Sequence, residues 1–320
     1  MNNFGNKYRI SIFGESHGKS VGILIDGCPT GILLNEDDFT SDLFRRKSGV
    51  RGTTSRIETD LPIIKSGVFN GKTTGAPIFI EFENTNIRSE DYSNLISQPR
   101  PSHADFVAHK KFNGYQDYRG GGHFSGRLTL GLVAAGVVAK KIIHDIKVTA
   151  NLTEVAGNNN IKQAVENAIK ENNSVGGIIE CVAKNMPIGL GEPFFNSVES
   201  QISILAFSVP GIKAIEFGAG FEGAKMKASQ FNDVIIDKNG TTKTNNSGGI
   251  NGGITNGNNL FFRVAVRPTA SISLAQHTFN FETNKTEELV VKGRHDACIA
   301  LRVPVIIEAI TAIALADFSL

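Results

Sequence analysis

The stretch RPSHADFVAHKKFNGYQDYRGGGHFSGR at 100–127, followed by LTLGLVAAGVVAKKIIHDI at 128–146, organises the rest of the chain. The first segment carries three of the seven histidines and a triple glycine at 120–122. Consecutive glycines suit positions with positive φ or close approach to a ligand. The second segment is apolar, rich in small residues and long enough for a buried helix. A glycine-rich loop leading into a helix presents free N–H groups to an anion. This predicts an anion site, with a surface glycine turn as the alternative.

The composition describes an ordinary globular protein of 320 residues, 40% hydrophobic and 20% charged. A net charge of +2 with mixed signs gives no broad basic surface for nucleic acid or an anionic membrane. The amino-terminal segment has no apolar targeting core, and no run approaches the roughly 18 apolar residues of a membrane span. Cys28, Cys181 and Cys298 are far apart and form no metal-binding motif. We expect a cytoplasmic protein with no metal, membrane or nucleic-acid partner.

The hydrophobic pattern predicts an α+β fold in one domain spanning 1–320. Hairpin-sized connections outnumber crossover helices, which favours antiparallel sheets. Strands are predicted at 8–13, 21–25, 61–68, 77–82, 176–183 and 260–266. Helices are predicted at 35–46, 128–145, within 151–175, at 197–207 and at 304–318.

Three further segments have both a structural and a functional interpretation. His17 lies in GESHG at the end of a strand, where the backbone presents it, although isolated histidines are often structural. The basic triplet at 45–47 suits a helix C-terminus, but arginines continue through KSGVRGTTSR at 47–56 and favour a phosphate clamp. NNSGGINGGITNG at 245–257 is either a flexible linker or an ordered loop against a ligand. No Rossmann or Walker A motif is present.

Seven motifs in a fixed order carry a resemblance that covers nearly the whole chain. They are GESHG at 14–18, RRKSG at 45–49, RPSHAD at 100–105, RGGGHFSGR at 119–127, NNSGGINGGITNG at 245–257, RPTAS at 267–271 and GRHDACIALRVP at 293–304. Together they resemble the chorismate synthase family.

The resemblance implies a β-α-β sandwich with antiparallel sheets around a helical layer, a homotetramer, and a need for reduced FMN. It implies the 1,4-anti elimination of phosphate from 5-enolpyruvylshikimate-3-phosphate to give chorismate, the last common step toward the aromatic amino acids. The flavin must be reduced although the reaction has no net redox change. One histidine would protonate the leaving phosphate and the other the flavin.

The resemblance also implies roles for individual residues. His17, His103 and Asp296 would be catalytic. Arg46, Arg51, Arg100 and Arg127 would face the substrate and its phosphate. The FMN contacts would be His123, Phe124, Ser125, Pro210, Gly211, Gly252, Arg267, Pro268, Thr269, Ala270, Ser271 and Arg294.

The sequence departs from the family pattern at a few of these motifs. Ser102 stands where a glycine is usual before the second histidine. His123 and Phe124 replace the usual arginine and serine after the glycines, so we expect backbone contacts there. Because no dinucleotide motif is present, an external flavin reductase is favoured over reduction by the chain's own use of NADPH. The alternative functions are a flavin- or nucleotide-binding protein without catalysis and, less favoured, an RNA-binding module.

Overall fold

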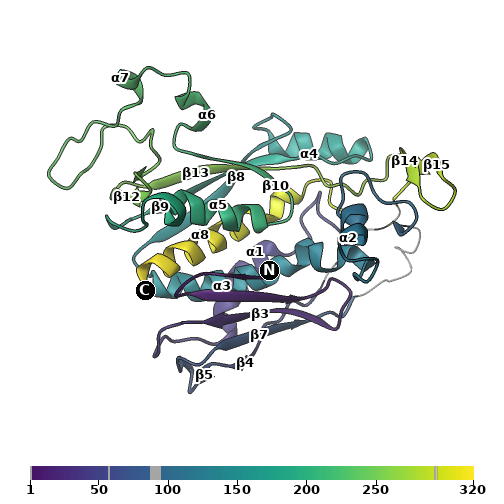
Figure 1. The fold of residues 1–320 in the computed structure, drawn as a ribbon, viewed down its shortest axis with the longest axis horizontal. Helices are drawn as coiled ribbons and strands as arrows, with labels where there is room; N and C mark the ends of the chain where they lie inside the picture. Colours follow the sequence, from purple (N-terminus) through teal and green to yellow (C-terminus); the bar gives the residue numbers. More distant parts are fainter. Residues whose placement is uncertain (1, 57, 87–94, 292, 294) are drawn as a thin grey trace.

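Two antiparallel sheets enclose a layer of helices (Figure 1). The computed structural model describes residues 2–56, 58–86, 95–291, 293 and 295–320. The five-stranded sheet has the order β1 (Asn3–Phe4), β2 (Arg9–Gly14), β3 (Ser20–Asp26), β7 (Ile78–Glu83) and β4 (Ile63–Ser66). The four-stranded sheet has the order β10 (Ile212–Phe217), β13 (Leu260–Val266), β9 (Gly177–Lys184) and β8 (Lys147–Val155). This arrangement confirms the α+β prediction and the β-α-β sandwich.

Five of the helices follow the predicted segments, and α2, α6 and α7 are additions. They are α1 (Thr40–Arg46), α2 (Asp105–Lys111), α3 (Thr129–Ile142), α4 (Ile161–Lys170), α5 (Val198–Ser208), α6 (Gly220–Gly223), α7 (Ala228–Phe231) and α8 (Pro304–Ser319). Asn35 caps a 3-10 turn ahead of α1, where its side chain accepts a 3.0 Å hydrogen bond from the Asp37 N–H. Among the described residues, no helix has the length and apolar character needed to cross a membrane.

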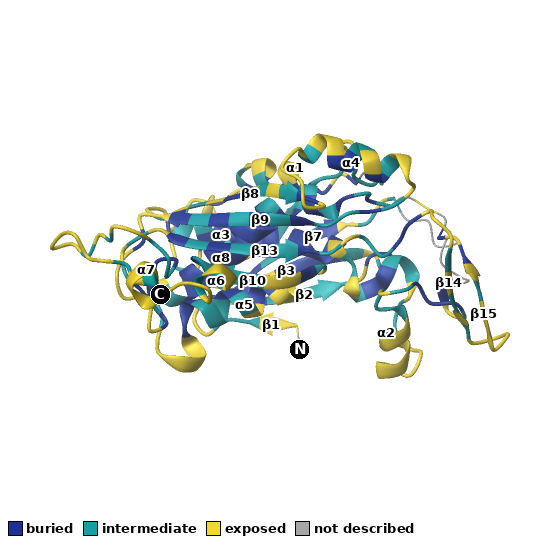
Figure 2. Ribbon diagram, turned by 90° about the horizontal axis from the view of Figure 1, so that it is seen from above, coloured by how far each residue is buried: buried dark blue, intermediate teal, exposed yellow. Residues whose placement is uncertain are grey.

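Helices α3 and α8 form the centre of the molecule and are buried on nearly all sides (Figure 2). An evenly apolar helix is stable only when surrounded, which explains why these two lie between the sheets. Their crossing is close, since a Cβ added at Gly136 would lie 2.3 Å from the Cβ of Ala309. The small residues of α3 therefore set the spacing between the two helices.

Three two-stranded hairpins extend from this body: β5 (Val68–Phe69) with β6 (Lys72–Thr73), β11 (Ile250–Asn251) with β12 (Ile254–Thr255), and β14 (Gln276–Asn280) with β15 (Lys285–Leu289). The second hairpin lies within the glycine-rich segment 245–257. Its strands pair in register, and the Ser247 N–H donates a 2.8 Å hydrogen bond to Asp233. The linker interpretation of this segment is therefore wrong, because the segment forms specific backbone contacts.

Candidate active site

The first turns of α3 and α8 meet loops from both sheets around a cavity of about 290 Å³. The amino-terminal ends of both helices therefore border the same space, where the positive ends of their dipoles favour anions. Most of the predicted site residues line this cavity: Arg46, Arg100, His103, Phe124, Ser125, Arg127, Pro210, Gly211, Arg267, Thr269, Ala270, Ser271 and Asp296. The fold therefore brings together residues as far apart in sequence as Arg46 and Asp296.

The side chains around the cavity are predominantly cationic. The cations are Arg46, Lys47, Arg56, Arg100, Arg127, Arg267 and Arg302, and the carboxylates are Glu58, Asp60 and Asp296. This excess of positive charge in a partly enclosed space attracts an anion more strongly than the same charges would at an open surface. The near-zero net charge of the whole chain conceals this local concentration.

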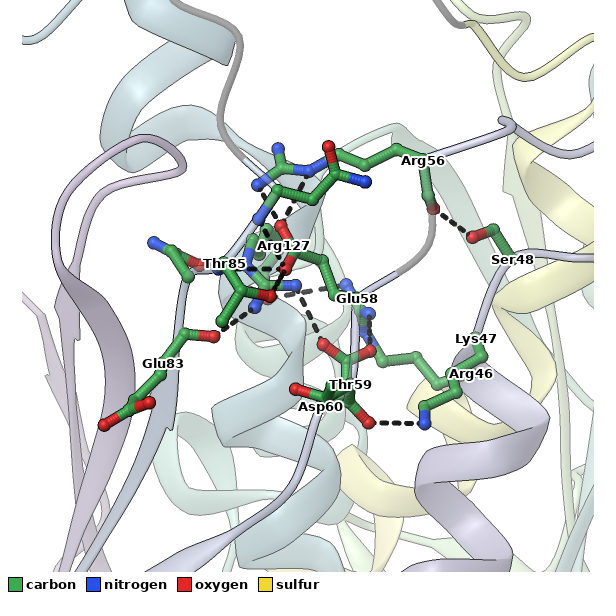
Figure 3. Close-up of polar contacts among 12 residues, drawn as sticks. Arg46, Lys47, Ser48, Arg56, Glu58, Thr59, Asp60, Glu83, Thr85 and Arg127 are labelled. Carbon is green, nitrogen blue, oxygen red and sulfur yellow. Dashed lines mark hydrogen bonds and ion pairs between the residues drawn. The ribbon is translucent and has the colours of Figure 1, made fainter.

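Arg46 and Arg127 share the carboxylate of Asp60 (Figure 3). Arg127 Nη1 donates to Asp60 Oδ1 at 2.9 Å, and Arg46 Nη1 lies 3.6 Å from Oδ2. Arg46 also donates from Nε to Thr129 Oγ1 at 3.1 Å and from Nη2 to the Gly126 carbonyl at 2.9 Å. These bonds fix both guanidinium groups at the beginning of α3.

Burial, together with the nearby cations Arg302 and Arg127, lowers the pKa of Arg46 to about 9 against the opposing effect of Asp60. The group is still charged at neutral pH, because the lowered value stays above 7. Its charge is nevertheless poorly compensated by the protein. A bound anion would relieve that cost, so the cluster is chemically suited to receive a phosphate or carboxylate.

Arg56 and Glu58 form a second charged pair at the cavity wall (Figure 3). Glu58 Oε1 accepts from Arg56 Nε at 3.0 Å and from Nη2 at 2.7 Å. Arg56 Nη1 also donates to Ser16 Oγ at 3.1 Å. The pair connects the basic loop after α1 to the turn after β2, which carries His17.

His103 enters the cavity from the segment before α2. Its Nδ1 lies 2.6 Å from Asp105 Oδ1. Arg100 binds the same carboxylate through two hydrogen bonds, from Nε to Oδ2 and from Nη2 to Oδ1, each 2.8 Å long. Arg100 also donates from Nη1 to Ser271 Oγ at 2.9 Å. Burial lowers the pKa of His103, and Asp105 partly offsets this effect.

His17 lies behind the triple glycine, next to the cavity wall rather than among the residues that line it. Its neighbours Ser16 and Gly120 both line the cavity. Burial lowers the pKa of His17 to about 4, with Arg56 adding to the effect, so the ring is neutral at pH 7. A Cβ at Gly120 would lie 2.3 Å from the His17 ring, which shows how closely the loop covers the imidazole.

Asp296 is buried at the edge of the cavity. Its Oδ1 accepts from the Thr54 N–H at 3.0 Å, and its Oδ2 accepts from Arg302 Nη2 at 2.8 Å. One carboxylate thus joins the basic loop after α1 to the segment before α8.

Other predicted residues lie elsewhere. Arg51 is exposed and ion-paired with Glu166 on α4, with Arg51 Nη2 2.8 Å from Glu166 Oε2. Gly252 forms the β11–β12 turn with φ 60°, away from the residues that line the cavity. The Nδ1 atom of His123 lies at hydrogen-bond distance, 2.8 Å, from the Gly14 carbonyl oxygen. Pro268 is flanked by lining residues but is not one of them, and Arg294 lies outside the described residues.

The cavity lining also includes apolar residues, namely Phe124, Val209, Pro210, Ile299, Val303 and Ile306. The segment 267–271 contributes Arg267, Thr269, Ala270 and Ser271 to the same lining. A lining that combines apolar and cationic side chains suits a ligand with a flat ring system and a phosphate, so these residues fit a flavin nucleotide.

The cavity contains charged residues that the sequence analysis did not select. Asp60 and Glu58 lie in no quoted motif, and Asp105, which binds His103 beside the cavity, ends the RPSHAD motif but was given no role. Arg56 and Arg302 did fall inside the quoted basic loop and the GRHDACIALRVP motif. Which arginine of such a segment turns inward depends on partners distant in sequence, such as Ser16 for Arg56.

Comparisons with known proteins agree on one family. The family model described as chorismate synthase matches residues 8–320. The chorismate synthase of Chitinophaga pinensis is 62% identical, covering 100% of this chain and 97% of that protein. That of Pyrococcus abyssi is 42% identical, covering 98% of this chain and 96% of that protein. A solved structure titled "Crystal Structure of Chorismate Synthase" superposes with a TM-score of 0.75 at 24% identity, covering 98% and 92% of the two chains, and supports the fold.

Proposed function

The chain belongs to the chorismate synthase family, and we propose that the cationic cavity is where it carries out the family's reaction. The protein is a lyase of aromatic amino-acid biosynthesis that eliminates phosphate from 5-enolpyruvylshikimate-3-phosphate to form chorismate. The observation that carries the assignment of the site is the concentration of arginines beside His103 at the first turns of α3 and α8.

Arg46 and Arg127 are the proposed phosphate-binding pair. Their guanidinium groups are oriented by Asp60 and by Thr129 or Asn84, so little reordering is needed when an anion arrives. Charge-assisted hydrogen bonds to the departing phosphate strengthen as negative charge develops on it. Arg100 adds positive potential nearby, although its hydrogen bonds already go to Asp105 and Ser271.

His103 and His17 are the proposed proton-handling groups. Histidine changes charge near neutral pH and is therefore suited to general acid catalysis. His17 is neutral in the described structure, because burial and Arg56 lower its pKa to about 4. A nearby phosphate dianion would raise that pKa and let the ring hold a proton at the start of the elimination.

Reduced FMN is the proposed cofactor, and the cavity-lining residues Phe124 and Pro210, together with the 267–271 segment, would hold it. When bound, it supplies an electron-rich ring that assists departure of the phosphate. Asp296 is the proposed carboxylate at the flavin edge, fixed by Arg302 and the Thr54 N–H. Arg51 and Gly252 lie away from the cavity and are left out of the proposed contacts.

The assembly and setting of the enzyme are also proposals from the family. We propose a homotetramer of single-domain chains in the cytoplasm. The reductant is proposed to come from an external flavin reductase, because no dinucleotide-binding motif occurs in the sequence. NADPH used directly by this chain is the alternative.

The cofactor proposal is tested by omission under anaerobic conditions. The complete mixture contains protein, 5-enolpyruvylshikimate-3-phosphate, FMN and dithionite, and chorismate is measured by its absorbance. Leaving out either FMN or dithionite should abolish turnover, and replacing dithionite with NADPH should not restore it. Full activity in air without flavin would contradict the proposed cofactor, and restoration by NADPH would contradict the external source.

A further inference from the structure

The His103 ring is anchored through one particular nitrogen. Nδ1 lies 2.6 Å from Asp105 Oδ1 and 3.0 Å from Arg100 Nη2. A carboxylate oxygen at hydrogen-bond distance requires a proton on Nδ1, since an ionised carboxylate only accepts. Arg100 Nη2 is also a donor, so its hydrogen goes to Asp105 Oδ1, 2.8 Å away, rather than to the protonated Nδ1.

Asp105 is itself held rigidly. Its Oδ2 accepts from Arg100 Nε at 2.8 Å and from the Arg100 backbone N–H at 3.1 Å. The side chains of Arg100 and Asp105 are only 5% and 9% exposed. Arg100 is tied in turn to Ser271, in the segment after β13. A planar two-point contact of this kind fixes direction as well as distance.

We propose that Asp105 is a positioning residue, which keeps the His103 proton on Nδ1 and leaves Nε2 as the nitrogen that exchanges a proton with ligands in the cavity. Arg100 supports this role, because its hydrogen bonds hold the Asp105 carboxylate in place. The inference rests on the proposed proton-handling role of His103. It also gives Arg100 a role different from direct phosphate binding.

The proton balance follows from this arrangement. Protonated His103 gives its Nε2 proton to an anionic acceptor in the cavity, and the ring becomes neutral with Nδ1–H still bound to Asp105. Burial opposes ionisation of Asp105, but hydrogen bonds from Arg100 and His103 outweigh burial and hold the pKa of this carboxyl well below its ordinary value. Asp105 therefore stays ionised throughout and does not take the proton itself.

A structural role for Asp105 is the competing explanation. Asp105 is the first residue of α2, where a carboxylate stabilises the helix dipole. Its side-chain hydrogen bonds nevertheless go to Arg100 and His103, which precede the helix. A dipole role and a positioning role differ in what removal of the carboxylate does to the His103 ring.

NMR of protein labelled with ¹⁵N-histidine measures that difference directly. The His103 signals are assigned by their loss in His103→Gln. In the wild type we expect the neutral ring of His103 to carry its proton on Nδ1. In Asp105→Asn and in Asp105→Ser we expect a mixture of tautomers or a proton mainly on Nε2. Asp117→Asn is the matched control, because it removes a carboxylate paired with Arg119 in the same loop region and should leave the His103 tautomer unchanged.

Kinetics provide the second measurement. Asp105→Asn should lower kcat about 10²-fold or more while KM changes by less than about threefold. The charged groups that act on the ring are Asp105, Arg100 and, from the segment after β13, Arg267. Because Asp105 raises the pKa of His103, its loss lowers that pKa. As the pH rises, activity that needs protonated His103 should therefore begin to fall at a lower pH in the variant than in the wild type.

The result that would overturn the proposal is a wild-type His103 tautomer in both Asp105 variants, or unchanged kcat in variants whose tautomer has shifted. Using two substitutions means that one misfolded variant does not decide the outcome. If the wild-type protein forms no chorismate, the proposed function fails, whereas the NMR result still reports on Asp105 and His103.

Discussion

Arg302 donates a 2.8 Å hydrogen bond from Nη2 to Oδ2 of Asp296. Asp296 precedes the 3-10 helix Ile299–Arg302, and Arg302 ends this helix just before α8. This contact gives Asp296 a defined orientation at the cavity edge, with Oδ1 held by the Thr54 N–H. The Asp296 carboxylate therefore has a structural role, in joining two loops, and a proposed role in proton transfer, and the two roles can be tested separately.

Asp296→Asn separates these roles. An amide can still accept the Thr54 hydrogen bond, so a role confined to loop stability predicts a small change in melting temperature and near-normal turnover. A proton-handling role predicts a fall in kcat of about 10²–10⁴-fold with substrate affinity largely kept. Anaerobic stopped-flow kinetics measure the turnover, and a near-normal rate would remove Asp296 from the mechanism.

The Arg46 guanidinium is buried and shares one carboxylate, that of Asp60, with Arg127. We therefore expect bound anions to stabilise the folded protein. Inorganic phosphate should raise the melting temperature of the wild type, because it binds the folded state and compensates the buried guanidinium. Arg46→Ala should show a smaller shift and a KM raised about 10–100-fold, as expected for a charge-assisted contact. Arg9→Ala is the control, since Arg9 pairs with Asp26 at the surface. An equal phosphate shift in Arg46→Ala would contradict the assignment.

Gly120 is predicted to be essential for the placement of His17. An alanine there would put Cβ 2.3 Å from the imidazole and 2.8 Å from Ser16 Oγ, at a backbone φ of 59°. We expect Gly120→Ala to displace the loop and lower kcat by at least about tenfold. For folding, the matched comparison is Gly126→Ala, where an added Cβ has open space. Wild-type turnover in Gly120→Ala would show that the loop tolerates the displacement.

Ser102 marks a local strain next to His103. Its φ is 57°, a left-handed conformation that favours glycine. Ser102→Gly should therefore stabilise the protein by up to about 1 kcal/mol, after the larger entropy of glycine in the unfolded chain is taken into account. Chemical denaturation measures the change. A clear loss of stability would mean that the serine side chain contributes a contact that outweighs the strain.

Much of the fold could be predicted from local pattern. Alternation identified β2, and apolar segments identified the helices α3 and α8, of which α3 was expected to be buried. Strand β8 was not identified, although Val148, Ala150 and Leu152 alternate with exposed polar residues along KVTANLTEV. The alternation is short and ends at the register shift between Leu152 and Glu154, and the strand is buried by packing against α8.

The sequence predicted which segments form the site, but not which side chains bind one another there. Motifs located His103, Arg127 and Asp296 at the cavity. They could not show that Arg100 would be committed to Asp105, or that Arg51 would turn outward to Glu166. These outcomes depend on partners brought together by the tertiary structure.

Formation of chorismate by wild-type protein and two histidine variants tests the central claim most directly. Under anaerobic conditions with reduced FMN, the wild type should convert 5-enolpyruvylshikimate-3-phosphate into equal amounts of chorismate and phosphate. His103→Gln, which alters the cavity, should slow this conversion about 10²-fold or more. His144→Gln, on an exposed side chain beyond α3, should match the wild type. No chorismate from the wild type, or equal rates from His103→Gln and the wild type, would contradict the account.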